Sequence, residues 1–350
     1  MKWEKSISVD EVILMIYPEF LKDDDVIGIS APSDGVVQEL DMKRLNNAIK
    51  KFNDIGYHVV EAESVRKSTN GKSNDDSTRA REVEDLFKNG RIKAIFSVGG
   101  GDFLLPILSE INFEIIKNNP KWLQGYSDPT GLLFTITTNF DIATIYADNF
   151  KAFGMRRWHK SLKNNLEILK GNLVEQKSFS KYQKERVEQV TGYEGYSLDK
   201  KVEWKAINCD NLLIKGRIIG GCIDILNDLF GTRFDKTNEF IDKYKSDGII
   251  WYFDNCELSN DQLIRTLWKF RDSGWFRYTK GIVFGRSMTN SSYYGITLES
   301  AIEEVLKDLE IPTIIDADIG HISPRMTIIN GAIATIKLKD KKGSIKFELV

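Results

Sequence analysis

The sequence predicts an α/β protein of two domains: a parallel sheet flanked by helices in the N-terminal half, and a mixed α/β C-terminal half with a β-rich tail. Three observations support this prediction. Short apolar runs alternate with helical patterns, turn residues follow most of these runs, and the last part of the chain alternates apolar and polar residues. At 350 residues the chain is also longer than a single hydrophobic core usually serves.

In the N-terminal domain, which we take as residues 1–170, strand patterns are followed by helix patterns. Arg79, Glu82 and Glu84 are expected to form the polar face of one of these helices. Because parallel strands leave their carboxyl ends at one edge of the sheet, the turns that follow them should converge on one ligand crevice. The expected elements are strands at residues 26–33, 57–62 and 94–98 and helices at residues 41–53 and 77–88.

Residues 171–205 are polar and charged, and we interpret them as a connection to a second domain over residues 206–350. Residues 326–339 alternate apolar and polar side chains, which is typical of antiparallel β-structure. The other elements expected in this domain are apolar runs at residues 212–219, 249–253 and 281–285 and helices at residues 223–230 and 260–273.

The composition favours a small-molecule partner. The 49 basic residues nearly cancel the 51 acidic ones, so no overall field would recruit nucleic acid or an anionic membrane. Cys209, Cys222 and Cys256 form no CxxC pair, which argues against a disulfide framework or a structural zinc site and suits a reducing cytoplasm. Residues 1–20 mix charged with apolar side chains, unlike a signal peptide or a spanning helix. We expect neither a metal nor a cofactor.

The most informative stretch is Gly125-Tyr126-Ser127-Asp128-Pro129-Thr130, where an extended apolar run meets a turn. Its hydroxyl makes Ser127 the candidate nucleophile. A serine needs a base that takes its proton and donors that receive the oxyanion, so such partners must exist elsewhere in the chain. The alternative is that Ser127 caps the next helix, with Pro129 at the first helical position.

The chain has three histidines, and His321 is the candidate base. It lies in a loop over residues 318–324 that contains glycine and proline, and such loops often carry functional side chains. The alternative is an exposed loop histidine without a function. His58, in a strand pattern, and His159, at the start of a helical pattern, are expected to be structural.

A histidine base needs a carboxylate that fixes its tautomer and stabilises its protonated form. Asp254 stands at the end of a buried strand and Glu257 follows it, so either could serve, or either could cap the next helix. Gly99-Gly100-Gly101 lacks a phosphate-binding spacing. Without Cβ atoms this turn could bring a backbone N–H close to an oxyanion, with the N–H of Asp128 as the second donor, or it is simply a tight turn.

Five stretches along nearly the whole chain resemble the LD-carboxypeptidase family of serine peptidases, to which microcin C immunity proteins also belong. The resemblance implies a Rossmann-like N-terminal domain with the nucleophile, a C-terminal domain with an acid and a histidine, and a homodimer. Family members similar to this chain carry glutamate where it has Asp254, whose side chain is shorter by one methylene. The matching stretches are Ser30-Ala31-Pro32-Ser33, residues 94–101, residues 125–130, residues 216–232 and Gly320-His321.

The reaction that the resemblance implies is acyl transfer. LD-carboxypeptidases act in the cytoplasm and release the terminal D-alanine of murein tetrapeptides, whereas the immunity branch cleaves a peptidyl- or aminoacyl-nucleotide at the same site. The implied site residues are Ser127 as nucleophile, His321 as general base, Asp254 or Glu257 as acid, and Gly100, Gly101 and Asp128 around the oxyanion.

Three other functions stay open at this point. An amidase of a toxic peptidyl-nucleotide would need aromatic side chains that stack on a base, for which Trp158, Trp204 and Trp275 are candidates. A binding protein that has lost catalysis is suggested by the shorter acid, Asp254. A nucleotide-binding oxidoreductase is suggested only by the glycine-rich turn.

Overall fold

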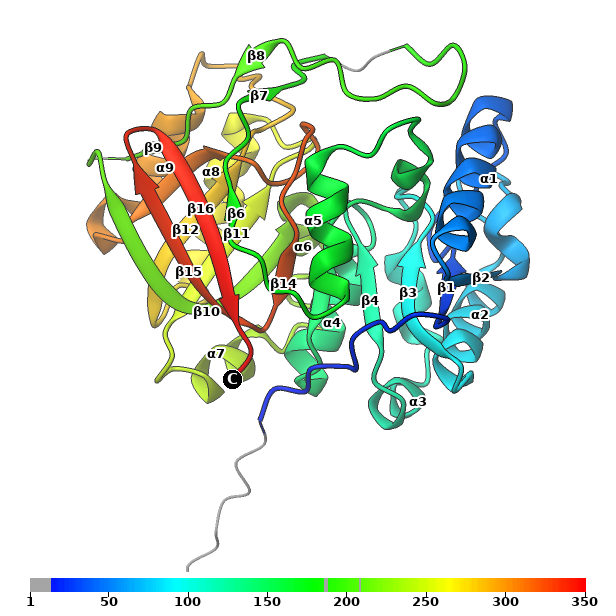
Figure 1. The fold of residues 1–350 in the computed structure, drawn as a ribbon. Helices are drawn as coiled ribbons and strands as arrows, with labels where there is room; N and C mark the ends of the chain where they lie inside the picture. The colour runs from blue at the N-terminus through cyan, green and yellow to red at the C-terminus, as the bar shows by residue number, and fades with distance from the viewer. Residues whose placement is uncertain (1–13, 186–187, 208) are drawn as a thin grey trace, which may run out of the picture.

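The computed structural model of the chain describes residues 14–185, 188–207 and 209–350. Two sheets lie side by side, each with helices packed against it, and a further segment runs along the top of the view in Figure 1. The predicted α/β fold, with a parallel-rich first sheet and a β-rich C-terminal part, is confirmed. Residues 1–13, where we predicted no export signal, and residues 186, 187 and 208 lie outside the described residues.

The first sheet follows the strand and helix alternation of the N-terminal half. Its strands are β1 (Val26–Ser30), β2 (His58–Glu61), β3 (Ile92–Ser97), β4 (Trp122–Gly125), β5 (Thr144–Tyr146) and β14 (Ile328–Asn330). The order is β14-β5-β4-β3-β1-β2, and the neighbours from β5 to β2 are parallel. β1 is buried along its whole length, as expected for an apolar run covered on both faces. β14 pairs antiparallel with β5, so a strand from residues 206–350 completes the N-terminal sheet.

Helices connect the strands of the first sheet. They are α1 (Glu39–Asp54), α2 (Asp76–Lys88), α3 (Phe113–Asn118), α4 (Thr130–Phe140) and α5 (Lys160–Leu169), with 3₁₀ turns η1 (Glu63–Arg66), η2 (Leu105–Ser109) and η3 (Phe150–Gly154). The prediction that Arg79 faces solvent on α2 is wrong, because this side chain is fully buried. Its guanidinium donates to the carbonyls of Pro32 and Phe103 and pairs with Asp76, and these partners offset the cost of burying the charge.

The second sheet is mixed. Its strands are β6 (Gln176–Lys177), β9 (Lys205–Ala206), β10 (Leu212–Cys222), β11 (Ile249–Asp254), β12 (Thr279–Gly285), β13 (Thr313–Ala317), β15 (Ile333–Lys339) and β16 (Lys342–Glu348). The order is β6-β16-β15-β10-β11-β12-β13-β9, with parallel pairs from β10 to β13 and antiparallel pairs toward both edges. Its helices are α6 (Ile223–Leu229), α7 (Thr237–Lys243), α8 (Asn260–Asp272) and α9 (Leu298–Leu306), with 3₁₀ turn η4 (Lys307–Leu309).

The described part of the segment that we predicted as a connection, residues 171–185 and 188–205, contacts both halves of the molecule. β6 adds to one edge of the second sheet, and β7 (Lys181–Tyr182) pairs with β8 (Lys200–Lys201) at the top of Figure 1. The N–H of Gln183 donates to the carbonyl of Ser323 at 2.8 Å. Nη1 of Arg44 donates to the carbonyl of Glu194 at 3.0 Å. The segment therefore contacts both halves of the molecule.

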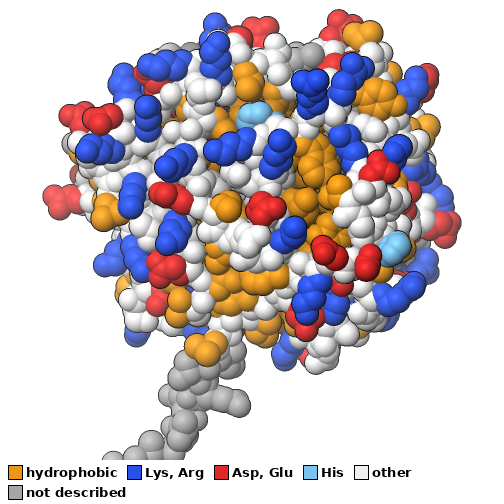
Figure 2. Space-filling view, viewed as in Figure 1, with side chains coloured by type: hydrophobic (Ala, Val, Ile, Leu, Met, Phe, Trp, Pro, Cys, Tyr) orange, Lys and Arg blue, Asp and Glu red, His pale blue; other side chains and the backbone are white. Residues whose placement is uncertain are grey.

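Basic and acidic side chains are interspersed on the face of the molecule drawn in Figure 2. Within the described ranges, none of the helices is both long enough and apolar enough to cross a lipid bilayer.

Candidate active site

Ser127 lies in a tight turn between strand β4 and helix α4. Its φ of 71° is in the left-handed region, which is uncommon for a residue with a side chain and is found at strained, functional turns. Gly125 makes the turn possible, because a Cβ there would lie 2.7 Å from the Cβ of Pro129. Pro129 occupies the N-cap position of α4, so the alternative in which Ser127 caps this helix differs from the structure.

The glycine turn after β3 lies directly against Ser127. A Cβ on Gly100 would be 3.0 Å from the Cβ of Ser127 and 3.1 Å from its Oγ, so glycine is required for this close approach. The same Cβ would be 3.9 Å from the backbone nitrogen of Asp128. Gly100 and Asp128, whose N–H groups we predicted as oxyanion donors, therefore meet at the candidate nucleophile.

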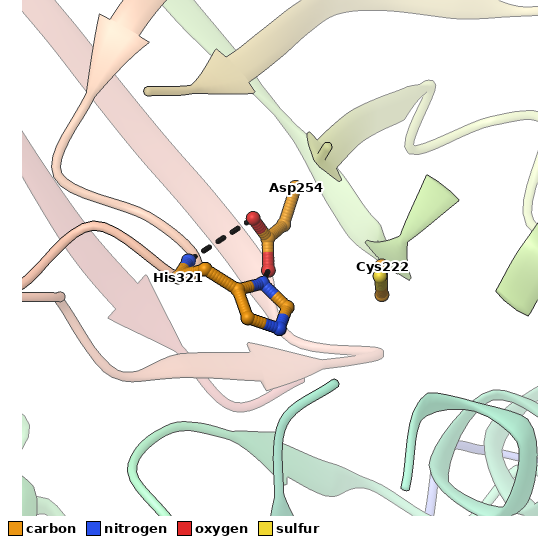
Figure 3. A group of neighbouring side chains, drawn as sticks. All are labelled: Cys222, Asp254 and His321. Carbon is orange, nitrogen blue, oxygen red and sulfur yellow. Dashed lines mark hydrogen bonds and ion pairs between the residues drawn. The ribbon is translucent and has the colours of Figure 1, made fainter. Parts of the chain in front are cut away.

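His321 and Asp254 form a hydrogen-bonded pair at the end of strand β11 (Figure 3). Nδ1 of His321 lies 2.7 Å from Oδ2 of Asp254, and the backbone N–H of His321 donates to Oδ1 at 3.1 Å. Asp254 is fully buried, and its Oδ2 also accepts a 2.5 Å bond from the hydroxyl of Tyr146. When Nδ1–H donates to the carboxylate, Nε2 is the nitrogen that can accept a proton.

The short side chain of Asp254 reaches the histidine because Gly320 lets the loop come close. Gly320 has a φ of 90°, and a Cβ there would lie 1.9 Å from Oδ1 of Asp254. Glu257, the other predicted acid, is exposed, and the helix that follows both acids is capped by Ser259. The carboxylate bonded to His321 is therefore that of Asp254.

Gly320→Ala is expected to lower turnover at least about 100-fold, because the added methyl group would overlap the Asp254 carboxylate and displace the histidine loop. Gly56→Ala is the matched control: Gly56 has a similar φ of 97°, but a Cβ there would meet nothing within 4 Å. Both variants carry the cost of positive φ, but only Gly320→Ala adds a clash. Measured kcat values that fall equally in both variants would contradict the role given to Gly320.

The Asp254–His321 pair is stabilised in its ionised form. Burial lowers the pKa of His321, but the charge of Asp254 and the hydrogen bond to it outweigh burial and hold the pKa above the ordinary histidine value. For Asp254, burial raises the pKa, whereas the charge of His321 and the bonds from His321 and Tyr146 lower it by more. The raised pKa of His321 and the lowered pKa of Asp254 have the same cause, which is the close contact between the imidazole and the carboxylate.

The pH dependence of activity follows from this raised pKa. A general base must be neutral in the free enzyme, so kcat/KM is expected to rise with pH as His321 loses its proton. The rise should be centred above about 6.5, the ordinary value for histidine. Asp254→Asn removes the charge that raises the pKa and should move the rise to lower pH. A kcat/KM profile that is flat from mildly acid to neutral pH would rule out His321 as the base.

Ser127 and His321 line one cavity of about 830 Å³, and residues from both halves of the chain form its wall. The rings of His321 and Tyr126 pack edge to face with 5.1 Å between their centroids, so the histidine lies beside the residue that precedes the nucleophile. A direct hydrogen bond between Ser127 and His321 is not among those of the described residues. Catalytic contacts of this kind often tighten only when substrate binds.

Several residues of this cavity were not anticipated from the sequence. Arg325 pairs with the buried carboxylate of Asp148, and its guanidinium lies 4.0 Å over the ring of Tyr126. Residues 183–185 and 194–196 form another part of the wall. A single arginine and a polar loop carry no local signal for a site, because only the folded chain brings them to the nucleophile.

The tryptophans considered for base stacking lie elsewhere. Trp204 and Trp275 are buried in the core, and Trp158 packs on a phenylalanine cluster of the first half. In the described part of the chain, the Phe, Tyr and Trp side chains that line the cavity are those of Tyr126 and Tyr196.

Among the described residues, the other two histidines do not line the cavity, although His159 packs against Tyr196 of its wall. His58 is exposed on β2. His159 is the N-cap residue of α5, where its Nδ1 accepts the backbone N–H of Ser161 at 3.1 Å. These placements suit the structural roles that we expected for them.

Cys222, Asp254 and His321 form a cluster of residue types that bind metals (Figure 3). One ligand atom from each lies within 4.8 Å of the others, and thiolate, carboxylate and imidazole are ligands of Zn²⁺. These groups are already used in hydrogen bonds: Asp254 accepts from Tyr146 and twice from His321, and the Cys222 thiol donates to Asp224 at 3.1 Å. A metal ion would have to break these bonds, so the cluster fits a hydrogen-bonded support for His321 better than a metal site.

Comparison with known proteins agrees with the sequence resemblance. Residues 27–147 match the LD-carboxypeptidase N-terminal domain, and residues 215–336 match the LD-carboxypeptidase C-terminal domain. The chain belongs to the LD-carboxypeptidase family. The predicted family is thus confirmed over most of the chain, in the order in which the motifs occur.

Proteins similar to this chain include ones named as carboxypeptidases and ones named as immunity proteins. A Bacillus subtilis protein named "Probable murein peptide carboxypeptidase" is 22% identical over 333 residues, covering 94% of each chain. The microcin C7 self-immunity protein MccF of Escherichia coli is 24% identical over 300 residues, covering 83% of this chain and 84% of MccF. The crystal structure of an MccF-like protein from Bacillus anthracis has a TM-score of 0.79 at 25% identity, covering 96% of this chain and 100% of that one.

Proposed function

We propose that the protein is a serine carboxypeptidase that hydrolyses an LD-peptide bond and releases the terminal D-alanine of a murein tetrapeptide. The observation that supports this most strongly is the 2.7 Å contact of the buried Asp254 with His321, which lines the same cavity as Ser127. Membership of the LD-carboxypeptidase family agrees with it, as does the similarity to the Bacillus subtilis protein named "Probable murein peptide carboxypeptidase". A cytoplasmic homodimer stays a prediction.

In the proposed reaction, Ser127 Oγ attacks the carbonyl carbon of the scissile amide while Nε2 of His321 takes the hydroxyl proton. Asp254 orients the imidazole and stabilises its positive charge. The backbone N–H groups of Gly100 and Asp128 receive the negative charge that develops on the carbonyl oxygen. His321 then gives its proton to the leaving amine of D-alanine, and a water molecule, deprotonated by the same histidine, releases the peptide from Ser127.

A second candidate is an amidase that inactivates a toxic peptidyl- or aminoacyl-nucleotide. The similarity to MccF favours it, since one MccF structure is described as a complex with aspartyl sulfamoyl adenosine. A cavity of about 830 Å³ also has room for such a ligand. The cavity offers few aromatic faces on which a base could stack. Arg325 covers one face of the Tyr126 ring, and the Tyr196 ring packs against His159 with 5.4 Å between centroids.

The test offers both substrates to the same enzyme preparation. A tetrapeptide that ends in D-alanine, its counterpart that ends in L-alanine, and a peptidyl-adenylate analogue are incubated with wild type and with Ser127→Ala, and the products are identified by mass spectrometry. We expect wild type to release alanine from the first peptide alone. Cleavage of the nucleotide conjugate alone would assign the second function, and the failure of all three substrates would contradict both.

A further inference from the structure

The carboxylate of Asp128 joins the turn after β1 to the turn after β3. Its Oδ2 accepts hydrogen bonds from the Ser33 hydroxyl and, at 2.9 Å, from the backbone N–H of Leu104. Asp128 is almost fully buried, and its backbone directly follows the candidate nucleophile at the end of β4. One side chain therefore ties three strand ends of the parallel sheet together.

A buried arginine joins the same two turns. Nη1 of Arg79, on α2, donates to the carbonyls of Pro32 at 2.7 Å and Ser33 at 3.2 Å, and to the carbonyl of Phe103 at 2.9 Å. The two turns are thus linked twice, once by a carboxylate and once by a guanidinium. We call this arrangement the turn clamp, and its members are Ser33, Arg79, Leu104 and Asp128.

The turn held by the clamp is the one that faces the nucleophile. It contains Gly100, which lies so close to Ser127 that a Cβ would be 3.0 Å from the serine Cβ. A Cβ on the next residue, Gly101, would be 2.2 Å from Oγ of Ser33. The Ser33 hydroxyl, which donates to Asp128, therefore also contacts the glycine turn whose backbone would supply an oxyanion donor.

We propose that the Ser33 hydroxyl and the Asp128 carboxylate are positioning groups for the oxyanion hole, which hold the backbone N–H of Gly100 in place beside Ser127. This role rests on the proposed serine hydrolase function and adds to it two side-chain groups that act without touching substrate. Oxyanion donors work through geometry, since they must lie about 2.7–3.1 Å from the developing charge. A turn that is fixed before substrate arrives meets this requirement without reorganisation.

The free-energy cost of burying the Asp128 carboxylate argues against a role for this side chain in packing alone. Burial raises the pKa of Asp128 to about 6, against the lowering effect of the bonds from Ser33 and Leu104. Asp102 raises this pKa further and Arg79 lowers it. Oδ1 of Asp128 is buried without a hydrogen-bond partner in the chain as described, which adds to the cost. An apolar side chain would fill the same space at a lower cost.

Acylation of Ser127 by p-nitrophenyl acetate tests this role, because a small activated ester needs the oxyanion hole but no peptide subsites. Ser33→Ala is expected to lower the second-order rate constant about tenfold, less than the roughly 10²- to 10³-fold loss typical of deleting a donor itself. Ser30→Ala is the matched control, since Ser30 is a buried serine of β1 whose hydroxyl has no partner among the described residues. Its rate should equal that of wild type.

Active-site titration counts the functional sites, and the melting temperature shows whether a variant is folded. Together they separate a loss of positioning from a loss of folding. Asp128→Asn keeps an oxygen that can accept both hydrogen bonds, so it should retain a higher rate per titrated site than Asp128→Ala. Equal rates per site in Ser33→Ala and Ser30→Ala would overturn the proposal. If wild type is acylated no faster than Ser127→Ala, the proposed hydrolase function fails first, and the positioning role falls with it.

Discussion

Ser127→Ala is expected to lower the turnover of the tetrapeptide by roughly 10⁴-fold or more, to the level that binding and the oxyanion donors support by themselves. The substitution removes the oxygen that we propose as the nucleophile, while the rest of the cavity wall is kept. Substrate binding should therefore persist. Release of D-alanine measures turnover, and isothermal titration calorimetry measures binding.

Ser109→Ala is the control for this variant, because Ser109 is an exposed serine of η2. It should behave as wild type in both measurements. Turnover by Ser127→Ala at the wild-type rate would show that the nucleophile is another residue. Loss of turnover together with loss of the folded circular dichroism spectrum would mean that the variant had failed to fold, and Ser127→Cys would then replace it.

Asp254→Asn is expected to reduce kcat by about 10³- to 10⁴-fold. The amide that replaces the carboxylate can donate to Nδ1 of His321, which would leave the proton on Nε2 and prevent that nitrogen from accepting the proton of Ser127. The hydroxyl of Tyr146, which donates to Oδ2 at 2.5 Å, would also lose a charged acceptor. Steady-state kinetics across the pH range measures both the loss in kcat and the shift of the profile.

Glu257→Gln tests the other acid under the same conditions. Glu257 is exposed at the cavity, whereas the carboxylate within 2.7 Å of the histidine belongs to Asp254. We expect kcat of Glu257→Gln to stay within about twofold of wild type, as for an ordinary surface substitution. A larger loss in this variant than in Asp254→Asn would reverse the assignment.

Much of the fold could be predicted because its central strands are continuous apolar runs that end in turn residues. β1 and β11 are buried along their whole length, and runs of this kind are typical of strands covered on both faces. The place of β14 could not be predicted, since a strand of three residues does not specify which of two sheets it joins. The burial of Arg79 could not be predicted, because its carbonyl partners are brought together only by the folded chain.

Ser127 and His321 could be chosen as candidates from the sequence because each stands in a turn with special backbone requirements, and their catalytic roles stay a prediction. Ser127 follows a glycine-containing strand end, and His321 follows Gly320 directly. The choice between Asp254 and Glu257 could not be made from the sequence, since it depends on how closely the loop of Gly320 approaches β11. The part of the wall formed by residues 183–185 and 194–196 could not be predicted either, because hydrogen bonds to distant parts of the chain place it at the cavity.

The mass of the protein, quenched with acid during turnover of the tetrapeptide, tests the central claim most directly. An acyl-enzyme adds the mass of the substrate less that of alanine, and proteolytic mapping locates the modified residue. We predict this adduct on the peptide that contains Ser127 and expect it to be missing from Ser127→Ala. An adduct on another residue of the cavity, such as Cys256, would contradict the proposed mechanism.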